Sequence, residues 1–523
     1  MNYFIFRNNT IERFFPKGYI FSGYDDISVI PDTADGYVWF FQLPVRINER
    51  TLCEEIRGYS EKLNLVLDQV ASFKPMFLLT MDEFPSIPIT SGVALKESIS
   101  GYNISLFEAQ KAHKNVYVLD IREFTHQYAE NDLIDWKFWF ISQMGLNPRL
   151  SKPFMDWFNR KLSQVSLKRK KCLVLDLDNT LWGGILGEDG INGIKLSGSY
   201  PGKAYHLFQE TLKELCKNGI ILTICSKNNE GEALDALDNN PFMILKKGDF
   251  SSWRINWKDK VTNIREIAEE LNIGLDSMVF IDDNPSEREL VRQVLPMVAV
   301  PEFPVQPYEL PVFCKELVEQ YFRVYSITVE DKNKNEQYRA NALRTRSQRT
   351  FTDMESFLQS LNIHIRIETA NEFNVPRIAQ MTQKTNQFNL TTRRYSESDI
   401  LSRLADGWEM YCMSVSDRFG DNGITGCILL NGYEIDSFLL SCRILGKGIE
   451  SAFLKTVLTG LRDRGIQSVT AEFIPTAKNA QVAEFYDNCG FTVIEKKEDG
   501  TKAYSLDLTT ADLNVKPYYS VIE

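Results

Sequence analysis

The alternation of apolar runs with helical patterns is clearest in the middle of the chain. Unbroken apolar runs occur in KCLVLDLD, GIILTICSK, FMILKKG, SMVFIDDNP and MVAVP, and between them lie helical patterns such as AYHLFQETLKELCKNG and KVTNIREIAEELNI. Continuous apolar strands that alternate with helices are typical of a parallel sheet that helices cover on both faces. The pattern therefore predicts an α/β domain over residues 166–315.

The flanking stretches have patterns of their own. Residues 1–165 mix the apolar runs YVWFFQLPV, MFLLTMDE and NVYVLDI with helical patterns such as TLCEEIRGYSEKLNLVLDQVASF, which predicts a second α/β domain. Residues 316–349 contain the charged stretch VEDKNKNEQYRANALRTRSQRT, which predicts a linker. In residues 350–523, strands are expected at IHIRIETA, GWEMYCMSVSD, GITGCILLNG and IQSVTAEFIP. The fold class is multidomain α/β.

Composition excludes several classes of function. The balance of 59 Lys and Arg against 70 Asp and Glu gives a net charge of −11, which argues against wide contact with nucleic acid or an anionic membrane. Nine scattered Cys with no CxxC pair indicate a reduced, cytoplasmic protein. The start MNYFIFRNNTIERFF does not have the pattern of a secretory leader, and no run of 18 apolar residues predicts a membrane span. The only His are His113, His126, His206 and His364, which disfavours a zinc site.

Three of the central apolar runs end in chemically active side chains. The first ends in Asp176 and Asp178, which alternation places on the same side of a strand. The other two runs end in Ser226, Lys227 and Asn228, and in Asp282 and Asp283. Because sites in open α/β sheets form at the carboxyl ends of strands, we expect these groups to converge. Four carboxylates in one place require a cation, and Mg²⁺ is the hard, oxygen-preferring ion that suits them.

A lysine at this edge would balance part of the charge. Lys260 begins the helical pattern VTNIREIAEEL and is preferred for that reason over Lys258, two residues earlier. The ordered set of motifs, a DxDxT sequence, a strand-end Ser, a Lys and a DD pair, resembles the haloacid dehalogenase (HAD) phosphotransferase superfamily. A DxD pair alone could instead be a strand end followed by a turn.

The HAD resemblance implies roles for each residue. Asp176 would be the nucleophile that forms an aspartyl-phosphate, and Asp178 would protonate the leaving oxygen and then activate water. Thr180 would brace the loop. The resemblance also implies that the phosphoryl group is bound by Thr180, Ser226, Lys227, Asn228 and Lys260, and that the metal is bound by Asp176, Asp178 (through its backbone carbonyl), Asp282 and Asp283. Neither the segment between Asp178 and Ser226 nor that between Lys227 and Lys260 has room for a cap domain, so the site should be open to a large substrate.

The third unit has a glycine loop between an apolar run and a helical pattern. RILGKG, from Arg443 to Gly448, follows IDSFLLSC and precedes IESAFLKTVLTGL, an arrangement that offers backbone N–H groups to a pyrophosphate. Together with NAQVAEFYDNCGF further on, it resembles the GCN5-related acyltransferase (GNAT) fold. The resemblance implies pantetheine-binding residues and a Tyr that protonates the leaving thiolate, namely Arg443, Gly446, Gly448 and Asn479, and Tyr486. A glycine turn followed by an ordinary helix end is the alternative.

The combination of these two motif sets resembles the FkbH-like HAD proteins (subfamily IIIC) over residues 172–508. The motifs include DLDNTLWGG, ICSKN, FIDDNPSERE, QKTNQFNLTTRRY, DRFGDNGITG, LSCRILGKGIE and IPTAKNAQVAEFY. Members resemble glyceryl transferase/phosphatases, which implies a Mg²⁺-dependent phosphatase that transfers glyceryl from 1,3-bisphosphoglycerate to the phosphopantetheine of an acyl carrier protein. Two alternatives remain: a plain phosphatase whose GNAT-like part only binds a partner, and an N-acyltransferase that uses acyl-CoA.

Glyceryl transfer through the enzyme requires a thiol. Cys442 precedes the Arg443 loop and lies next to the expected pantetheine path, whereas Cys225 precedes Ser226 and alternates to the opposite face. A thiolate beside helix-terminal N–H groups and an Arg has a lowered pKa, which favours Cys442. Each Cys could also be a small buried core residue.

Two polar segments and the N-terminal domain offer further candidates. QKTNQFNLTTRRY carries Lys384, Asn386, Gln387, Asn389, Arg393 and Arg394, which could bind a polyol phosphate or form a solvated loop. DRFGDNG predicts a hairpin turn in which Asp417 could be a base. The N-terminal domain resembles a reduced SGNH-hydrolase fold with Ser22 near the nucleophile position. No DxxH motif supplies a base, so a docking role is expected.

Overall fold

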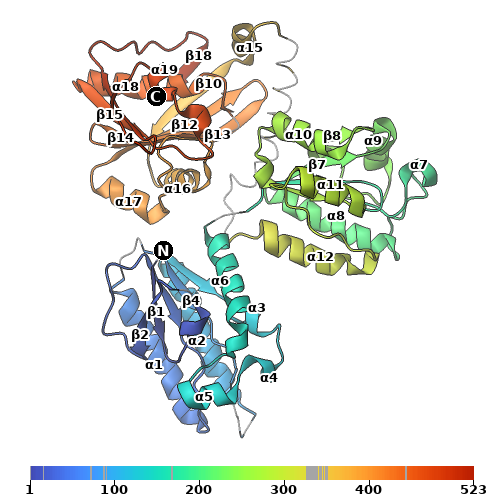
Figure 1. Cartoon of the computed structure of the whole chain (residues 1–523), viewed down its shortest axis with the longest axis vertical. Coiled ribbons are helices and arrows are strands. Elements are labelled where there is room, and N and C mark those ends of the chain that lie inside the picture. Colours follow the sequence, from blue (N-terminus) through green and yellow to red (C-terminus); the bar gives the residue numbers. More distant parts are fainter. Residues whose placement is uncertain are drawn as a thin grey trace. The chain divides into compact units, whose positions relative to one another are not determined.

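The computed structural model describes residues 2–522, except 16, 71–73, 86–88, 90, 167–168, 326–337, 339, 341–343, 345–346, 348–350 and 442–443. The described chain forms two compact units (Figure 1). The first comprises Met1–Val165 with Ser396–Ser402, and the second comprises Ser166–Tyr395 with Arg403–Glu523. Each unit contains parallel β-structure covered by helices, as the alternating pattern predicts. No described helix has the length and apolarity that a membrane crossing requires.

The first unit is built on a five-stranded sheet of order β2-β1-β3-β4-β5, in which every neighbouring pair is parallel. Aromatic side chains of α6 cover one face, where Phe154 stacks on Phe40 and Phe158 meets Phe77 edge-on. Helices α1 and α2 pack against each other, and buried side chains of both join the strand residues in one apolar core. The strands are β1 (Tyr3–Arg7), β2 (Ile20–Tyr24), β3 (Gly36–Phe40), β4 (Met76–Leu79) and β5 (Val116–Leu119), and the helices are η1 (Glu12–Phe14), α1 (Glu49–Leu67), α2 (Val93–Ala112), α3 (Arg122–Thr125), α4 (Glu130–Leu133), α5 (Trp136–Ser142), η2 (Pro148–Leu150) and α6 (Ser151–Val165).

The second unit contains two sheets. Its first part, called here the four-stranded half (residues 166–322), has a parallel sheet of order β8-β7-β6-β9. Its strands are β6 (Cys172–Leu175), β7 (Ile221–Ser226), β8 (Phe250–Ile255) and β9 (Met278–Ile281). Its helices are α7 (Leu186–Asp189), α8 (Gly202–Lys217), α9 (Glu230–Asn239), η3 (Lys247–Asp249), α10 (Lys260–Leu271), η4 (Leu275–Ser277), α11 (Pro285–Val294), η5 (Pro307–Glu309), α12 (Leu310–Leu317) and the π-helical turn η6 (Val318–Phe322).

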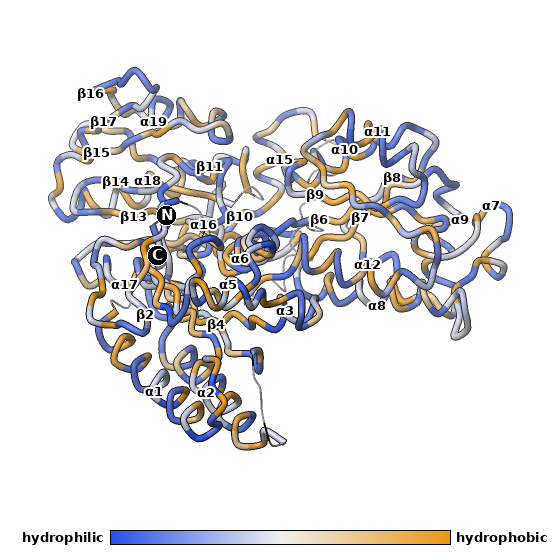
Figure 2. Tube along the Cα trace, turned by 60° about the horizontal axis from the view of Figure 1, so that its bottom comes forward, coloured by the Kyte–Doolittle hydropathy of each residue, from blue (hydrophilic) through white to orange (hydrophobic). Residues whose placement is uncertain are grey.

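Strand β6 shows why its apolar run is continuous. Cys172 and Val174 join a core with α10 and α11, whereas Leu173 and Leu175 join a core with α8, α9 and α12. Because successive side chains point to opposite faces, a strand covered on both sides needs apolar residues at every position. The tube in Figure 2 is accordingly coloured as hydrophobic along the central strands of this sheet.

Two strands that the sequence predicts in this half are not formed. FMILKKG, residues 242–248, is irregular, and the fourth strand is instead the more polar β8. Met243 and Leu245 are buried in the core although no strand holds them, which explains the misleading apolar signal. MVAVP provides only an isolated bridge between Ala299 and Val279. The expected boundary at residue 315 also falls short, because Leu317 and Phe322 belong to the same core.

The remainder of the second unit, called here the nine-stranded half (residues 351–522), has a mixed sheet of order β16-β17-β15-β14-β13-β12-β10-β18, with β11 added to β14. Its strands are β10 (Ile363–Thr369), β11 (Phe388–Asn389), β12 (Glu409–Asp417), β13 (Gly420–Asn431), β14 (Glu434–Leu440), β15 (Ser468–Phe473), β16 (Thr492–Lys496), β17 (Lys502–Asp507) and β18 (Tyr519–Ile522). Its helices are α15 (Met354–Leu361), α16 (Val375–Lys384), α18 (Ile449–Asp463), η8 (Ala480–Val482) and α19 (Phe485–Asn488). Helix α17 (Glu397–Ala405) lies between α16 and β12 in the chain, but its residues up to Ser402 belong to the first unit.

The parallel strands β14 and β15 are paired only between the beginning of β14 and the middle of β15. Their register joins Glu434 to Thr470 and Ile435 to Ala471, and no further pair follows in the described strands. Beyond this point β11 lies against the end of β14. Leu390 continues this contact, because its N–H donates to the carbonyl of Phe438 and its own carbonyl accepts from Ile474 N, 2.8 Å away. Residues 388–390 therefore bridge the opening between the two strands.

Candidate active site

The carboxyl ends of β6 and β9 bring three carboxylates together. Asp176 follows β6 directly, and its N–H donates to the carbonyl of Ile281 at the end of β9 (3.0 Å). Asp282 and Asp283 follow that residue, and Asp176 and Asp282 are buried. One carboxylate oxygen from each of Asp176, Asp282 and Asp283 lies within 4.8 Å of the others. The parallel register of β6 and β9 thus places the two acidic motifs side by side.

Lys260 supplies the positive charge at this cluster. It is the first residue of α10, whose N-cap Asp259 accepts a hydrogen bond from Thr262 N. Its Nζ lies 2.8 Å from Asp176 Oδ1 and also pairs with Asp282. Burial alone would lower the pKa of Lys260, but the charges of Asp176 and Asp282 outweigh burial and raise it. Lys258, the alternative, has an exposed side chain paired with Glu266, 3.2 Å away.

The carboxylate of Asp178 is held apart from this cluster by three donors. Oδ1 accepts from Trp182 Nε1 and from Leu186 N, each at 3.0 Å, and Oδ2 accepts from Asn228 Nδ2 at 3.0 Å. Burial raises the pKa of Asp178, as does the charge of Asp176, against the lowering effect of the hydrogen bonds. A carboxyl group with a raised pKa is suited to donate a proton. Trp182 and Leu186 were not predicted from the sequence.

The loop after Asp178 is fixed by short-range hydrogen bonds. Thr180 is fully buried and its Oγ1 accepts from Asp283 N at 3.1 Å, so it ties the loop after β6 to the DD motif. Asn179 has a left-handed backbone (φ 52°), and its Oδ1 accepts from Gly184 N at 2.8 Å. These bonds position Asp178 relative to Asp176.

The end of β7 closes the other side of the site. Ser226 is the last residue of β7 and is buried. Lys227, which follows, forms an ion pair with Glu287, and Asn228 donates to Asp178 as described. Of the expected phosphate-binding residues, Asn228 and Lys260 therefore contact the candidate catalytic carboxylates directly, whereas the Lys227 amine is paired with a different carboxylate.

The acidic cluster fits a divalent cation. Burial and the charges of Asp176 and Asp282 raise the pKa of Asp283 to about 6. Such mutual repulsion is relieved when a cation shares the oxygens, and all three donors are the oxygen ligands that Mg²⁺ prefers. The carboxylate of Asp178 is outside this set among the described residues, so its expected metal contact would be through the backbone carbonyl.

Of the two candidate thiols, only Cys225 is among the residues that the structure describes. Cys442 and Arg443 lie outside the described residues. Cys225 points into the apolar core with Val261 and Ile264, is fully buried, and lies 3.8 Å from the carbonyl of Lys260. Burial raises the pKa of the Cys225 thiol, which disfavours the thiolate. Cys225 is therefore a core residue.

The glycine loop of the GNAT-like motifs precedes a helix, as expected, but Asn479 and Tyr486 of these motifs are fully buried. Gly446 and Gly448 adopt left-handed backbones (φ 77° and 71°), and Gly448 is the N-cap of α18. Tyr486 is 1% exposed, and its hydroxyl has no hydrogen-bond partner among the described residues. Burial raises the pKa of Tyr486 far above its ordinary value.

Asn479, which is expected to bind pantetheine, is bonded within the chain in this structure. Its Nδ2 donates to the carbonyls of Asn389 and Ile474 (both 2.9 Å), and its Oδ1 accepts from Thr476 N (2.7 Å). The side chain is fully buried. Asn479 thus fastens β11 to the loop after β15, because every polar atom of its carboxamide is already bonded within the chain.

Several polar residues of the nine-stranded half are likewise used internally. Arg393 pairs with Asp436 and Glu472, both at 2.7 Å, and Arg394 donates to the carbonyl of Thr385 at 2.8 Å. Neither Arg projects as a solvated cation. Asp417, considered as a base, is wrong for that role because its buried carboxylate pairs with Arg344 through both oxygens.

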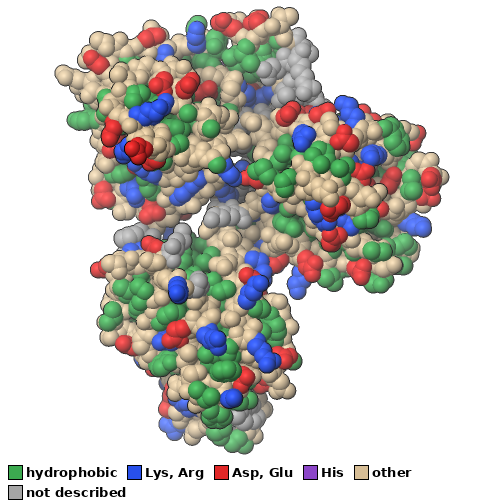
Figure 3. All heavy atoms as spheres, in the orientation of Figure 1, with side chains coloured by type: hydrophobic (Ala, Val, Ile, Leu, Met, Phe, Trp, Pro, Cys, Tyr) green, Lys and Arg blue, Asp and Glu red, His purple; other side chains and the backbone are tan. Residues whose placement is uncertain are grey.

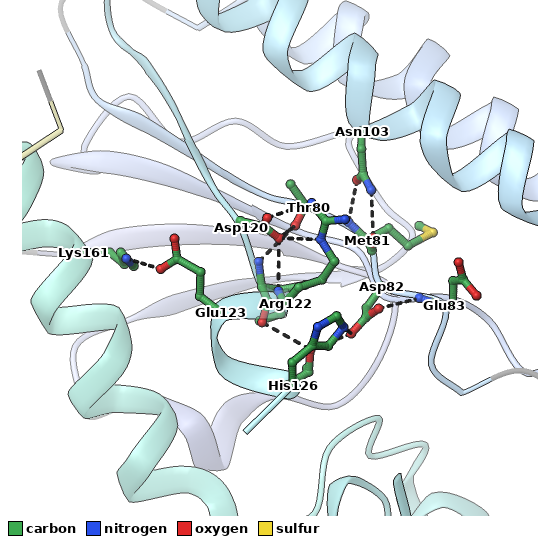
Figure 4. Close-up of polar contacts among 12 residues, drawn as sticks. Thr80, Met81, Asp82, Glu83, Asn103, Asp120, Arg122, Glu123, His126 and Lys161 are labelled. Carbon is green, nitrogen blue, oxygen red and sulfur yellow. Dashed lines mark hydrogen bonds and ion pairs between the residues drawn. The ribbon is translucent and has the colours of Figure 1, made fainter. Parts of the chain in front are cut away.

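The first unit offers no activated serine among its described residues. Ser22 lies within β2, accepts from Arg7 N and donates to the Gly23 carbonyl, so it is not presented at a strand end. The structure does bring an Asp–His pair together without a DxxH motif: Nε2 of His126, after α3, lies 3.5 Å from Asp82 Oδ2, after β4 (Figure 4). Thr125 also donates to Asp82.

Comparisons with known proteins agree with the carboxylate site. Residues 171–309 match the family model NIF, described as NLI interacting factor-like phosphatase. Among solved structures, the chain is 27% identical to the N-terminal part of a Bacteroides fragilis protein that contains a phosphatase domain and is complexed with Mg. This match covers 62% of the present chain and 94% of the other, with a TM-score of 0.53. The chain therefore contains a HAD-type phosphatase domain. No curated protein matches it.

More distant similarities involve acetyltransferases. The ribosomal-protein-S18-alanine N-acetyltransferase of Escherichia coli is 16% identical, with 29% of this chain and 99% of that chain covered and a TM-score of 0.22. A GNAT family acetyltransferase from Elizabethkingia anophelis, solved with acetyl-CoA bound, is 13% identical, with 28% and 98% covered and a TM-score of 0.20. At these values neither match bears on the activity of this chain.

Proposed function

We propose that this protein is a Mg²⁺-dependent phosphohydrolase that acts through an aspartyl-phosphate on Asp176 and couples this chemistry to transfer of a glyceryl group onto an acyl carrier protein. The observation that carries the phosphatase part is the shared contact of Lys260 with Asp176 and Asp282 beside the separately held Asp178. One carboxylate thereby has a cation beside it, and another is held apart for proton transfer.

The residues support a two-step reaction. A carboxylate oxygen of Asp176 forms a bond to phosphorus as the bond from phosphorus to the leaving oxygen breaks, and Asp178 donates its proton to that oxygen. Asp178, now ionised, then takes a proton from a water whose oxygen attacks phosphorus, which releases phosphate and restores Asp176. Lys260 neutralises charge on the phosphoryl oxygens throughout. When bound by Asp176, Asp282 and Asp283, Mg²⁺ would supply Lewis-acid neutralisation of the same charge.

The glyceryl-transfer part of the proposal draws on the sequence motifs. The FkbH-like set of motifs pairs a phosphatase with a glycine loop suited to a pantetheine arm, and the phosphorylated acyl donor would resemble 1,3-bisphosphoglycerate. The elements between Asp178 and Ser226 are only α7, α8 and their loops, which supports an uncapped site that admits a group carried by a cytoplasmic carrier protein.

A second candidate is a plain phosphatase whose nine-stranded half only binds a partner. The burial of Tyr486 and the internal bonding of Asn479 favour it, because neither side chain is presented to a ligand in this structure. The two candidates differ in whether acyl mass appears on a carrier.

Intact-protein mass spectrometry tests the proposal. The full chain would be mixed with Mg²⁺, 1,3-bisphosphoglycerate generated in place and a panel of holo acyl carrier proteins. We expect a glyceryl-sized mass gain on one carrier together with phosphate release, and loss of phosphate release in Asp176→Asn. Phosphate release with no acyl mass on any carrier would support the plain phosphatase, and unchanged phosphate release by Asp176→Asn would overturn both candidates.

A further inference from the structure

A pocket of about 330 Å³ lies within the second unit, away from the carboxylate cluster. Side chains of α16 and the residues after it form one wall, with Arg377, Lys384 and Asn386 among them. Residues 273–277, which precede β9, form another. The volume is in the range of small-molecule sites and is large enough for a short phosphorylated organic acid.

The lining of this pocket is strongly cationic. Its described residues include four cations, Lys171, Arg377, Lys384 and Lys478, and one acid, Asp276, which gives a formal charge of +3 (four minus one). Lys478 pairs with Asp276. Although burial raises the pKa of Asp276, its hydrogen bond with Lys478 and the charges of Lys478, Lys171 and Lys170 outweigh burial and lower it. The pocket therefore has the electrostatic character of an anion site.

Hydrogen-bond donors accompany the charge. Asn386 and Gln387 line the pocket beside Lys384, so the first part of the motif QKTNQFNLTTRRY faces it. The second part does not, because Arg393 and Arg394 are bonded within the fold. Apolar side chains such as Met381 and Leu440 complete the wall. A site lined by cations, amides and apolar groups suits a small molecule with an anionic end and a hydroxylated chain.

The pocket is at the opposite end of the parallel sheet from the phosphatase residues. Lys171 and Ser277 line it and precede β6 and β9, whereas Asp176 and Asp282 follow those strands. Each strand has four residues, or about 13 Å at about 3.3 Å per residue. A phosphate held by Lys171 therefore cannot be the one attacked by Asp176.

The pocket also reaches the end of β14. Leu440 and Ser441 line it, and the next residue in the chain is Cys442, the thiol candidate. An anionic ligand in the pocket would thus be bound beside the end of β14, and not at the hydrolytic centre.

We propose that this pocket is a second phosphate site, which binds the phosphate-monoester end of a small hydroxy-acyl compound through Lys384, Lys171 and Lys478. The inference rests on the proposed function and assigns binding and hydrolysis to different sites. The acyl compound is bound in the cationic pocket with its phosphate intact, and that phosphate is removed later at Asp176. Inorganic phosphate shares the anionic chemistry but lacks the chain that the amides and apolar wall would contact.

Calorimetric titration of the full chain tests this site with 3-phosphoglycerate, glycerate and inorganic phosphate as probes, in an Asp176→Asn background that prevents turnover. We expect 3-phosphoglycerate to bind at least about tenfold more tightly than glycerate, which lacks the charge-assisted bonds of the phosphate, and also more tightly than inorganic phosphate, which lacks the chain that the amides and the apolar wall contact. Lys384→Gln and Lys171→Gln should each weaken it about tenfold, Lys384→Arg should restore most of the affinity, and Lys258→Gln, an exposed lysine in the same unit, should not change it.

A separate assay distinguishes this inference from the proposed function. With Asp176 intact, Lys384→Gln should hydrolyse a simple aryl phosphate at the wild-type rate and lose acyl delivery to the carrier. Affinity for 3-phosphoglycerate that is unchanged in both Lys→Gln variants overturns the pocket, as does inorganic phosphate binding equally well, whatever the phosphatase does. Absence of aryl phosphatase activity in the wild type overturns the proposed function alone.

Discussion

Lys260 Nζ lies 2.8 Å from Asp176 Oδ1 while it also pairs with Asp282, so one ammonium group joins the carboxylates that end two neighbouring parallel strands. The lysine begins α10 and is buried, which leaves it little freedom to turn elsewhere. A cation held in this position can neutralise the charge that develops on a phosphoryl group bound there.

Replacing Lys260 should therefore affect both catalysis and metal dependence. Lys260→Met is expected to lower kcat for an aryl phosphate by about 100- to 1000-fold, the range for removal of one electrostatic group. It should also enlarge the rise in Tm on addition of Mg²⁺, because Asp176, Asp282 and Asp283 then lack a resident cation. Lys258→Met removes the same charge from an exposed position and should change neither quantity. Equal loss of activity in both variants would contradict the assignment.

Asp178→Asn should separate the two chemical steps. Asn can neither donate nor accept the proton, and such a loss typically costs about 100- to 10,000-fold. With an aryl phosphate, whose leaving group needs little protonation, formation of the phosphoenzyme should persist while its hydrolysis slows. Rapid acid quench and mass spectrometry should then show one added phosphoryl group, located at Asp176 by peptide mapping. A phosphoenzyme that forms and hydrolyses at the wild-type rate would show that Asp178 does not act in the second step.

Asn479 should be a stability residue. Asn479→Ala removes three hydrogen bonds and leaves the buried carbonyls of Asn389 and Ile474 and the N–H of Thr476 unpaired. We expect a loss of about 2–4 kcal/mol in the free energy of unfolding, measured with urea. The exposed Asn488→Ala, in the same half, should stay within about 0.5 kcal/mol. Unchanged stability with lost CoA binding would instead restore the pantetheine role.

Lys447, in the glycine loop, should make stability depend on pH. Burial and the charge of Arg344 lower its pKa from 10.5 to about 8, against the raising effect of Asp417 and Glu450. Because the unfolded chain keeps this proton up to the higher value, folding is penalised below pH 8 and the penalty fades between pH 8 and 10.5. Lys447→Met should thus raise Tm at pH 7 and have a smaller effect at pH 10. A Tm increase that is equal at both pH values would rule out titration of Lys447 as the cause.

The carboxylate site was predictable from the sequence because its residues adjoin regular elements. Asp176 and Asp282 directly follow apolar strands, and Lys260 begins a helix, so strand order and helix phase suffice to bring them together. Trp182 lies in the irregular loop after β6 and Leu186 begins the four-residue α7, so no periodicity in the sequence predicts that both hold Asp178.

Other residues could not be assigned from the sequence, because the polarity of a side chain does not show which residue it contacts in the fold. Asn479 and Asp417 resemble ligand groups in sequence, but each is bonded to residues far away in the chain, Asn389 and Arg344. The apolar run of residues 242–248 resembles a strand, but it supplies buried side chains from an irregular segment, while the more polar β8 takes the sheet position. The balance of acidic and basic side chains, which the composition predicts, is visible on the face shown in Figure 3.

The bridge formed by residues 388–390 has a consequence for cooperativity. The nine-stranded sheet joins β14 directly to β15 through only two register pairs, so strands β15, β16 and β17 would be a weakly attached group without it. The hydrogen bonds from Phe438 through Leu390 to Ile474 tie both groups to one short segment. Opening of that segment, observed by amide hydrogen exchange, would therefore expose the amides of Leu390 and Ile474 together and leave the shared apolar core as the main link between the strands on its two sides.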